Sequence, residues 1–324
     1  MRFPGEWEQH ERTLMGWPCR RELWGPTLEQ AKADYAEVAN AIADFEDVTM
    51  IAGSPADARD ARAACTGRVQ IVELPIDDSW LRDSGPIYVV DDAGGRVAVH
   101  FQFNAWGERF TPYDRDVEIG SLIARELEDE VREVAMVLEG GSVISDGAGT
   151  ILTTEQCLLA PNRNPRLSRG AIEELLAEHL GAERLVWLGR GLLEDRDTDG
   201  HVDLIAAFTP DRRALVQTVP SGNPNHEHCA ENVARLQEAG IETIEVPHLA
   251  YREVAGETVA VSYLNLYICT GAVIVPTAGD EFDEEALAII GDAFPGRSVV
   301  PVRGNTLAYG GGGPHCITQQ VPAV

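Results

Sequence analysis

The segment PIYVVDDAGGRVAVHFQF at residues 86–103 is followed by VEIGSLIARELEDEVRE at 117–133 and VAMVL at 134–138. Its first part has two apolar or alternating runs around a Gly-rich turn, which predicts a β-hairpin. The charged stretch that follows has the apolar spacing of a helix, and the last run has the length of a short strand. The sequence therefore predicts a hairpin, a helix and a strand in succession, the pattern of an α/β fold.

The same order of elements recurs along the chain. GSVISDGAGTILTT is followed by the helical SRGAIEELLAEHLG, with Gly181 as its stop, and by the strand RLVWL. Two further copies cover 202–246 and 266–302, and the helix at 28–45, VTMIAG and the final GGGPHCITQQ would form a fifth unit shared between the two ends. We therefore expect one closed domain of five similar units over residues 1–324.

The charge and the lysine content of the chain disfavour several classes of function. The chain has 53 acidic and 26 basic residues, a net charge of −27, which repels nucleic acid and anionic lipid and attracts cationic ligands. Solubility in a saline cytoplasm is an alternative cause of this charge. The only lysine, Lys32, lies in a helical segment, so a Walker-type loop is absent and a Schiff-base lysine elsewhere is excluded.

The opening sequence and the cysteines indicate the cellular compartment. The first residues lack the basic start and apolar run of a signal peptide, and no later stretch approaches the ~20 apolar residues of a membrane span. Six scattered cysteines form no C-x-x-C pair, so we expect reduced thiols. The sequence predicts a soluble, cytoplasmic protein, and it is compatible with a homo-oligomer.

Polar residues occur at the mouths of successive hairpins: Asp83, Glu139, His201, Asn265 and Cys316. In a closed array of units, equivalent positions converge on the central axis, as strand-end residues do in barrels. We therefore expect these side chains, remote in sequence, to share one pocket. Each also has a structural explanation: a buried thiol, turn and capping acids, a hydrogen-bonded histidine, or an amide at a strand end.

The local context of two of these residues favours chemistry. Cys316 follows four glycines in GGGGPHCITQQ, which let the backbone approach a ligand closely. His201 and Asp203 lie two apart before an apolar run, and on a strand they would point to the same side. A thiol, an imidazole and carboxylates together suit attack on a planar cation such as a guanidinium, with the histidine moving protons.

Eight segments, in order, resemble the agmatine deiminase family, within the group that includes bacterial peptidyl-arginine deiminases. They span essentially the whole chain and are EWEQHERTLMGWP, DDSWLRDSGP, FNAWG, EGGS, PNRNP, TDGHVD, SYLNLYICTGAVIVP and GGGPHCITQQ. The combination of WxRDxGP and GGGxHCITQQ is highly specific. The resemblance implies a five-bladed α/β propeller (pentein) of ββαβ units, which matches the repeat found in the sequence.

The resemblance also implies roles for individual residues. Cys316 would be the nucleophile, His201 the general acid and base, and Asp83 and Asp203 the carboxylates that hold the guanidinium. The remaining predicted site residues are the acid of the EGG motif and three substrate contacts: Glu139, Trp80, Asn265 and Gly313. Agmatine would lose ammonia through a covalent thiouronium on the cysteine, leaving N-carbamoylputrescine, without a metal or an organic cofactor.

Two departures from the family pattern leave undetermined which group the substrate carries beyond its guanidinium. Thr270 stands where asparagine is common, and the loop after FNAWG is short. Another arginine derivative, including peptidyl-arginine, is an alternative substrate; an amidinotransferase and a non-catalytic guanidine-binding protein are alternative functions. His226, His228 and Cys229 resemble metal ligands, but no fourth ligand is evident, so we predict no metal site there.

Overall fold

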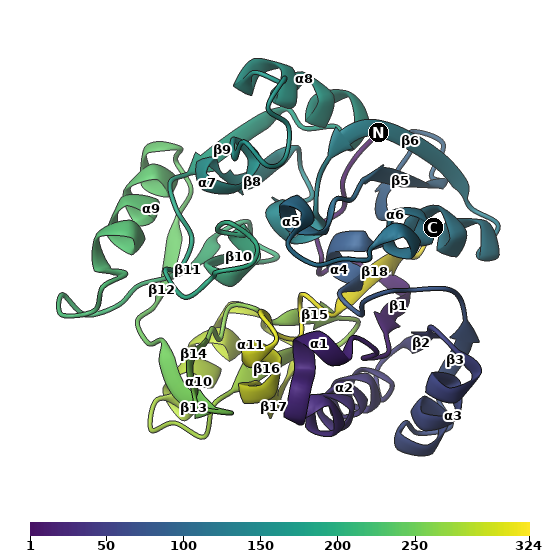
Figure 1. The fold of residues 1–324 in the computed structure, drawn as a ribbon. Helices are drawn as coiled ribbons and strands as arrows, with labels where there is room; N and C mark the ends of the chain where they lie inside the picture. Colours follow the sequence, from purple (N-terminus) through teal and green to yellow (C-terminus); the bar gives the residue numbers. More distant parts are fainter.

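The computed structural model describes residues 1–324 and contains six β-sheets. Five of them share one pattern, in which an antiparallel pair of strands is extended by a parallel strand. Figure 1 shows these sheets arranged around a common centre, with most of the long helices on the outside. The fold is thus a mixed α/β fold of repeated ββαβ units.

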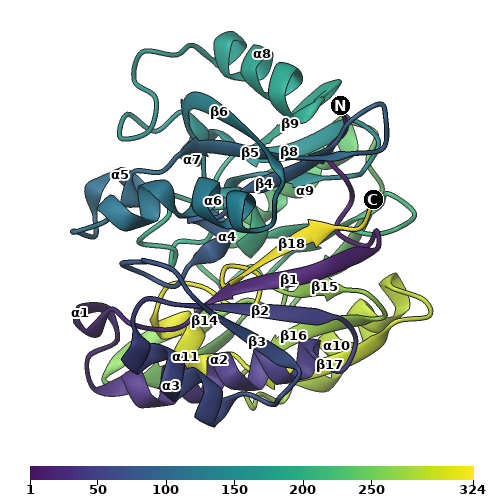
Figure 2. The same ribbon diagram turned by 90° about the vertical axis from the view of Figure 1, so that its right-hand side faces the viewer.

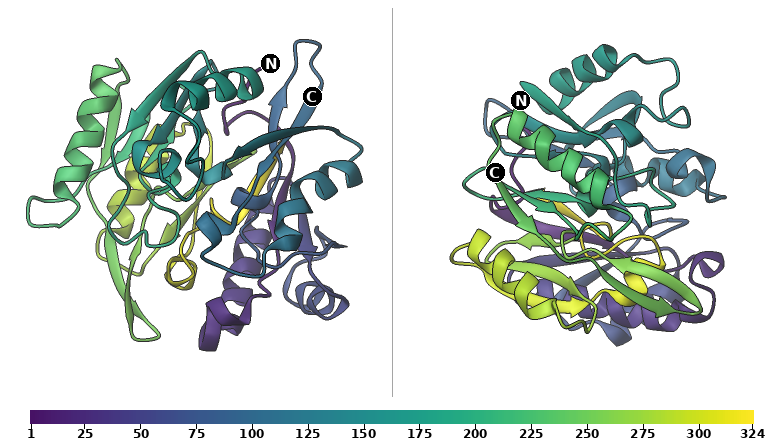
Figure 3. Two further views of the ribbon diagram at one scale, coloured as in Figure 1. Left: turned by 45° about the horizontal axis from the view of Figure 1, so that its top comes forward. Right: turned by 90° about the vertical axis from the view of Figure 1, so that its left-hand side faces the viewer.

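The four units within the chain follow one another in sequence, each with its helix before the last strand. They comprise β4 (Ile87–Val90), β5 (Arg96–Gln102), α6 (Asp114–Glu126) and β6 (Glu130–Val137); β7 (Ile144–Ser145), β8 (Thr150–Thr154), α8 (Arg169–Leu180) and β9 (Arg184–Leu188); β10 (Ala206–Phe208), β11 (Ala214–Gln217), α9 (His226–Glu238) and β12 (Thr243–Val246); and β15 (Tyr267–Cys269), β16 (Ala272–Thr277), α10 (Asp283–Ala293) and β17 (Ser298–Arg303). Figure 3 shows α8, α9 and α10 along one side of the molecule.

The fifth unit joins the two ends of the chain. Its sheet has the order β18-β1-β2-β3, where β18 is Thr318–Pro322, β1 His10–Gly16, β2 Asp47–Ala52 and β3 Val69–Glu73. Strand β18 pairs antiparallel with β1, and the two lie side by side in Figure 2. Helices α2 (Leu28–Ile42) and α3 (Pro55–Ala64) complete it. This pairing places the Gly-rich segment before β18 beside the N-terminal strand.

The helix at 169–180 shows how local sequence sets an element. The Ser168 side chain accepts a hydrogen bond from the Ala171 amide at 3.2 Å, which caps the helix start. Gly181 has φ 70°, a left-handed conformation that ends the helix at little cost for glycine. Ile172, Leu176 and Leu180 are fully buried on one face, as the apolar spacing predicts.

Several sequence predictions need correction. The helix predicted over 117–133 spans 114–126, because the chain turns at Glu128, which has φ 58°, and its last part is strand β6. The helix predicted over 28–45 ends at Ile42. Strands β1 and β3, helix α3 and the hairpin of β13 (Ala250–Val254) with β14 (Glu257–Val261) were not predicted. Their apolar runs are short, and tertiary pairing stabilises them.

The short helical segments lie between the main elements and carry most of the site. They are α1 (Arg21–Trp24), η1 (Gly25–Thr27), α4 (Leu81–Ser84), α5 (Ala105–Glu108), η2 (Gly140–Ser142), α7 (Glu155–Leu158), η3 (Val202–Leu204) and α11 (Asn305–Tyr309). No helix combines the length and the apolar character needed to cross a membrane.

Candidate active site

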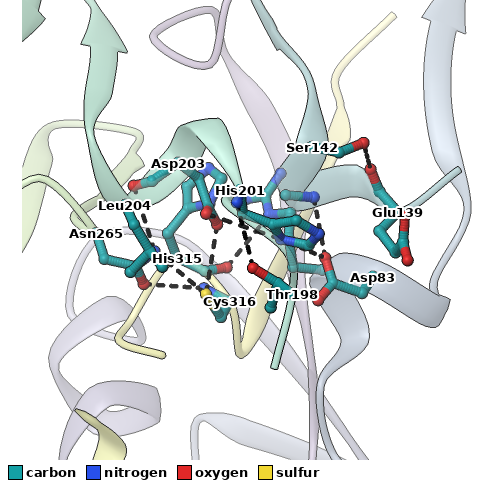
Figure 4. A network of polar contacts seen from close by, with 12 residues as sticks. Asp83, Glu139, Ser142, Thr198, His201, Asp203, Leu204, Asn265, His315 and Cys316 are labelled. Atoms are coloured by element: carbon teal, nitrogen blue, oxygen red, sulfur yellow. Dashed lines mark hydrogen bonds and ion pairs between the residues drawn. The ribbon is translucent and has the colours of Figure 1, made fainter. Parts of the chain in front are cut away.

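Five separate segments of the chain bring six of the predicted site residues close together (Figure 4): Asp83, Glu139, His201, Asp203, Asn265 and Cys316. Asp83 lies in α4, Glu139 directly precedes η2, His201 directly precedes η3, and Cys316 lies just before β18. Asp83, His201, Asp203 and Cys316 are each at most 4% exposed. The predicted convergence of residues remote in sequence is therefore present in the geometry.

Cys316 is held by hydrogen bonds on both sides. Its thiol donates to Asp203 Oδ2 at 3.3 Å, and the Asn265 side-chain amide donates to the sulfur at 3.2 Å. The Cys316 amide also contacts Asn265 Oδ1 at 3.3 Å. Burial raises the pKa of this thiol well above its usual value, and the carboxylates of Asp203 and Asp83 raise it further. These surroundings therefore favour the thiol over the thiolate.

The glycines before Cys316 are required by close packing. A Cβ at Gly312 would lie 2.7 Å from the Cys316 sulfur, and one at Gly313 would lie 2.8 Å from Asn265 Oδ1. Trp80 packs against the same loop, 2.9 Å from the position of a Gly312 Cβ, and stacks on Trp24 with ring centroids 5.8 Å apart. The predicted substrate contacts Trp80, Asn265 and Gly313 thus all lie beside the thiol.

The imidazole ring of His201 faces two carboxylates, but neither of its nitrogens forms a hydrogen bond. Its Nδ1 lies 3.8 Å from Asp83 Oδ1 and 4.0 Å from Asp203 Oδ1, and neither ring nitrogen has a partner. The expected strand is absent here, since residues 202–204 form a 3-10 turn and β10 begins at Ala206. The turn, rather than strand alternation, brings His201 and Asp203 to the same side.

Gly141 occupies the middle of this cluster. A Cβ there would lie 2.6 Å from His201 Nδ1 and 2.9 Å from both Asp203 Oδ2 and Asp83 Oδ1. Its amide donates to Asp83 Oδ1 at 3.0 Å. The second glycine of the EGG motif therefore orients one carboxylate, and a side chain at this position would clash with three polar groups.

The two aspartates differ in their electrostatics. Burial raises the pKa of Asp83 to about 6; His201 counteracts this, while the negative charges of Asp203 and Glu139 add to it. Burial would also raise the pKa of Asp203, but the hydrogen bond from His315 and the charges of His315 and His201 lower it. Environments that push two neighbouring pKa values apart are typical of catalytic sites.

Three residues that sequence reasoning did not assign also hold the site. The Trp106 indole donates to Asp83 Oδ2 at 3.0 Å, from a turn in which Trp106 has φ 55°. The Arg163 guanidinium donates to Glu139 Oε1, and His315 Nδ1 lies 2.8 Å from Asp203 Oδ2. All three lie in motifs already noted, FNAWG, PNRNP and GGGPHC, but their partners are remote in sequence.

The residues that resemble metal ligands have other contacts. His226 Nδ1 lies 2.9 Å from the Val219 carbonyl, and Cys229 is packed in an apolar cluster. In the site, one ligand atom each from Glu139, Cys157 and His201 lies within 4.8 Å of the others. Glu139 Oε1 already accepts a hydrogen bond from Arg163. This ion pair, instead of a metal ion, balances the charge of the Glu139 carboxylate.

A cavity of about 300 Å³ opens beside the reacting groups and ends at Asn265, Gly312 and Gly313. Four carboxylates line it, those of Glu194, Asp195, Asp197 and Glu257, against the single guanidinium of Arg196. The Asp195 carboxylate accepts hydrogen bonds from Thr198 and Gly200 in the turn that follows it. The cavity is therefore negatively charged, and it lies beside Gly312, which packs against Cys316.

A buried thiol, an imidazole and two carboxylates between repeated ββαβ units define the class of guanidine-modifying cysteine enzymes. The model of the Porphyromonas-type peptidyl-arginine deiminase family matches residues 2–322. An agmatine deiminase of Stutzerimonas stutzeri is 40% identical over 99% of this chain and 95% of its own length. The chain therefore belongs to the Porphyromonas-type peptidyl-arginine deiminase family.

Solved structures give the same result. The agmatine deiminase of Enterococcus faecalis has a TM-score of 0.94 at 31% identity, covering 99% of this chain and 95% of its own. A substrate-bound agmatine deiminase of C. jejuni has a TM-score of 0.93 at 27% identity, covering 99% and 96%. Both share the fold over essentially the full length of each chain.

Proposed function

We propose that this chain hydrolyses agmatine to N-carbamoylputrescine and ammonia through a covalent adduct on Cys316. One observation supports this most directly: Asp203 Oδ1, Glu139 Oε2 and both His201 nitrogens are buried without a partner. Buried polar atoms are rarely left unsatisfied, and these are mostly acceptors. A planar cation with several N–H groups supplies the missing donors, and the named relatives are agmatine deiminases.

The architecture that we propose is a single catalytic domain over residues 1–324, with the five ββαβ units closed as a five-bladed propeller. Two features support it. The units have the same strand order and lie around one centre, and the sheet formed by both ends of the chain joins the last unit to the first. Site residues from each unit then face the axis.

Asp83 and Asp203 would hold the guanidinium. A carboxylate matches the planar fork of a guanidinium, as it does that of arginine. Both aspartates are buried, and holding two such negative charges close together is costly, so a cation between them is favourable. The same cation offsets the negative charges that raise the pKa of Cys316, so substrate binding favours the thiolate.

The reaction then has two halves. Cys316 gives up its proton to His201 as the sulfur bonds to the guanidinium carbon. His201 then passes that proton to one nitrogen, and the C–N bond breaks to release ammonia. In the second half, His201 takes a proton from water as the oxygen bonds to the same carbon. The C–S bond breaks, the thiol is restored, and a urea leaves. These steps use only groups of the chain, the substrate and water.

The negatively charged cavity would receive the far end of the substrate. Asp197 lines it and contacts Gly311, where a Cβ would lie 3.1 Å from its carboxylate. The structure gives Asp197 no hydrogen-bond partner, and burial together with Asp195 raises its pKa. A terminal ammonium beside this carboxylate would restore its charge balance. A substrate carboxylate in the same place would be repelled.

We therefore expect agmatine to exceed free arginine and peptidyl-arginine by about a hundredfold in kcat/KM, roughly 2.7 kcal/mol. Steady-state ammonia release across the three substrates measures this. Arginine or peptidyl-arginine within about tenfold of agmatine would refute the substrate assignment. A new guanidine in place of a urea would identify an amidinotransferase, and no product from any of them would identify a non-catalytic binding protein.

The contribution of Asp197 is separable in the same assay. Asp197→Asn keeps the size of the side chain and removes its charge, so kcat/KM for agmatine should fall by about tenfold. Butylguanidine, which has the same chain without the terminal ammonium, serves as the matched substrate and should be little affected. An equal loss with both substrates would indicate a general disturbance of the site instead of recognition of the ammonium.

The pKa of Asp83 predicts a pH dependence. Burial raises it to about 6, and only the ionised carboxylate attracts the guanidinium. The value of kcat/KM for agmatine should therefore be level above this pH and fall about tenfold per pH unit below it. A pH–rate profile from about pH 5 to 8 checks this. A profile that stays flat to pH 5 would show that Asp83 is not the titrating group.

A further inference from the structure

His315, directly before the nucleophile, lies between two carboxylates. Its Nδ1 is 2.8 Å from Asp203 Oδ2, and its Nε2 is 2.7 Å from Glu6 Oε1. An ionised carboxylate only accepts hydrogen bonds, whereas a neutral imidazole has a single N–H. Both contacts are satisfied together only if both nitrogens carry a proton, so the geometry indicates an imidazolium.

The charges around His315 come from three separate elements. Glu6 lies in the segment before β1, Asp203 lies in η3, and Arg82 in α4 donates to Glu6 Oε1 at 3.2 Å. Burial and Arg82 would lower the pKa of His315, but Glu6 and Asp203 outweigh them and raise it. Burial would raise the pKa of Glu6, but His315 and Arg82 lower it to about 2.

This arrangement determines the orientation of the Asp203 carboxylate. Its Oδ2 accepts hydrogen bonds from both His315 and the Cys316 thiol, whereas its Oδ1 has no partner and faces His201 (Figure 4). A carboxylate with one oxygen fixed in this way cannot exchange its two oxygens freely. The oxygen directed to the thiol and the oxygen left for the guanidinium are therefore distinct.

We infer that Glu6 and His315 are positioning residues, which keep Asp203 ionised and fix one of its oxygens toward the thiol and the other toward the substrate. The inference rests on the proposed function only in assigning Asp203 to the guanidinium. It also gives a role to the N-terminal EWEQHE motif, whose Glu6 has a side chain only 13% exposed and contacts His315.

A neighbouring residue separates positioning from simple anchoring of the segment. Glu8 forms an ion pair with Arg2 and accepts a hydrogen bond from the Gly5 amide at 2.8 Å. Its side chain is 33% exposed and contacts none of the site residues, so it anchors the same segment without touching His315 or Asp203. Glu8→Gln is therefore the matched control for Glu6→Gln.

The experiment compares Glu6→Gln, His315→Ala and His315→Asn with wild type. We expect His315→Ala to lose about a hundredfold in kcat/KM for agmatine, and His315→Asn, which keeps a neutral donor, to recover about tenfold of it. Glu6→Gln should equal wild type at acid pH and fall about tenfold relative to it as the pH rises, because His315 without the Glu6 charge loses its proton at lower pH than in wild type. Glu8→Gln should follow wild type throughout.

Two measurements do not depend on agmatine turnover. The rate at which 2-chloroacetamidine, a small amidinium electrophile, alkylates Cys316 should show the same order among the variants. Histidine ¹⁵N NMR should show His315 doubly protonated in wild type at neutral pH, and losing its proton at lower pH in Glu6→Gln than in wild type. Absence of agmatine turnover by wild type would refute the proposed function, while these readings would still test the positioning role.

The inference is overturned by any of three results. One is a neutral His315 in wild type. Another is His315→Ala within about threefold of wild type, in both turnover and alkylation. The third is a loss in Glu8→Gln equal to that in Glu6→Gln, which would reduce the role of Glu6 to anchoring the segment. Because Glu6→Gln nearly preserves size, it tests the role even if His315→Ala fails to fold.

Discussion

Cys316→Ala should lower agmatine turnover by at least about 10,000-fold, because it removes the sulfur that would form the covalent intermediate. The substitution removes one sulfur from a buried position and leaves the carboxylates of Asp83 and Asp203 in place. Agmatine should therefore still bind, which isothermal titration can measure. Intact-mass analysis during turnover should show an adduct on wild type and none on the variant.

Cys229→Ala is the matched control. This cysteine is also buried, but it lies in α9 and packs in an apolar cluster. Its loss should lower stability by about 1 kcal/mol through lost packing and leave turnover intact. Substantial ammonia release by Cys316→Ala would disprove covalent catalysis by this residue, whatever the control shows.

His201→Ala should lower kcat by about a thousandfold, because it removes the proton carrier from both halves of the reaction. Its ring is completely buried and its two nitrogens lack partners, so the imidazole makes no hydrogen bond that the fold would lose. We expect little adduct by intact mass when the first half is blocked. His248→Ala, on the surface beside Glu285 and Phe282, is the matched control.

The amount of adduct in His201→Ala separates two mechanisms. If the histidine is needed to protonate the leaving ammonia, the thiouronium does not accumulate. A large adduct peak with no release of product would show instead that His201 acts only in hydrolysis. Retained turnover would show that another base serves, and the unpartnered carboxylate oxygen of Glu139 would be the next candidate.

Local sequence was sufficient for the repeating units. The helix at 169–180 has its cap, its stop and its apolar face within a few residues, so neighbouring positions alone specify it. Strand β9 likewise occupies the predicted residues 184–188. The candidate residues Cys316, His201, Asp83, Asp203 and Glu139 were found because each lies in a distinctive motif at a hairpin mouth, and the structure brings them together.

Partners in the site depended on tertiary structure. Glu6 and His315, Arg163 and Glu139, and Trp106 and Asp83 are pairs that are remote in sequence or lie in different elements, and no local pattern links them. The motifs containing them were visible, but not the contacts.

The sequence by itself determined the α/β units, the acidic character and the set of reactive side chains, because periodicity, capping and motifs are local properties. Only the folded chain determined that His201 and Asp203 lie on a 3-10 turn, that Cys316 donates to Asp203, and that His315 lies between two carboxylates. The physical reason is that hydrogen bonding and the pKa of a buried group depend on neighbours supplied by other units. Those neighbours are set when the two ends of the chain pair as β18 and β1.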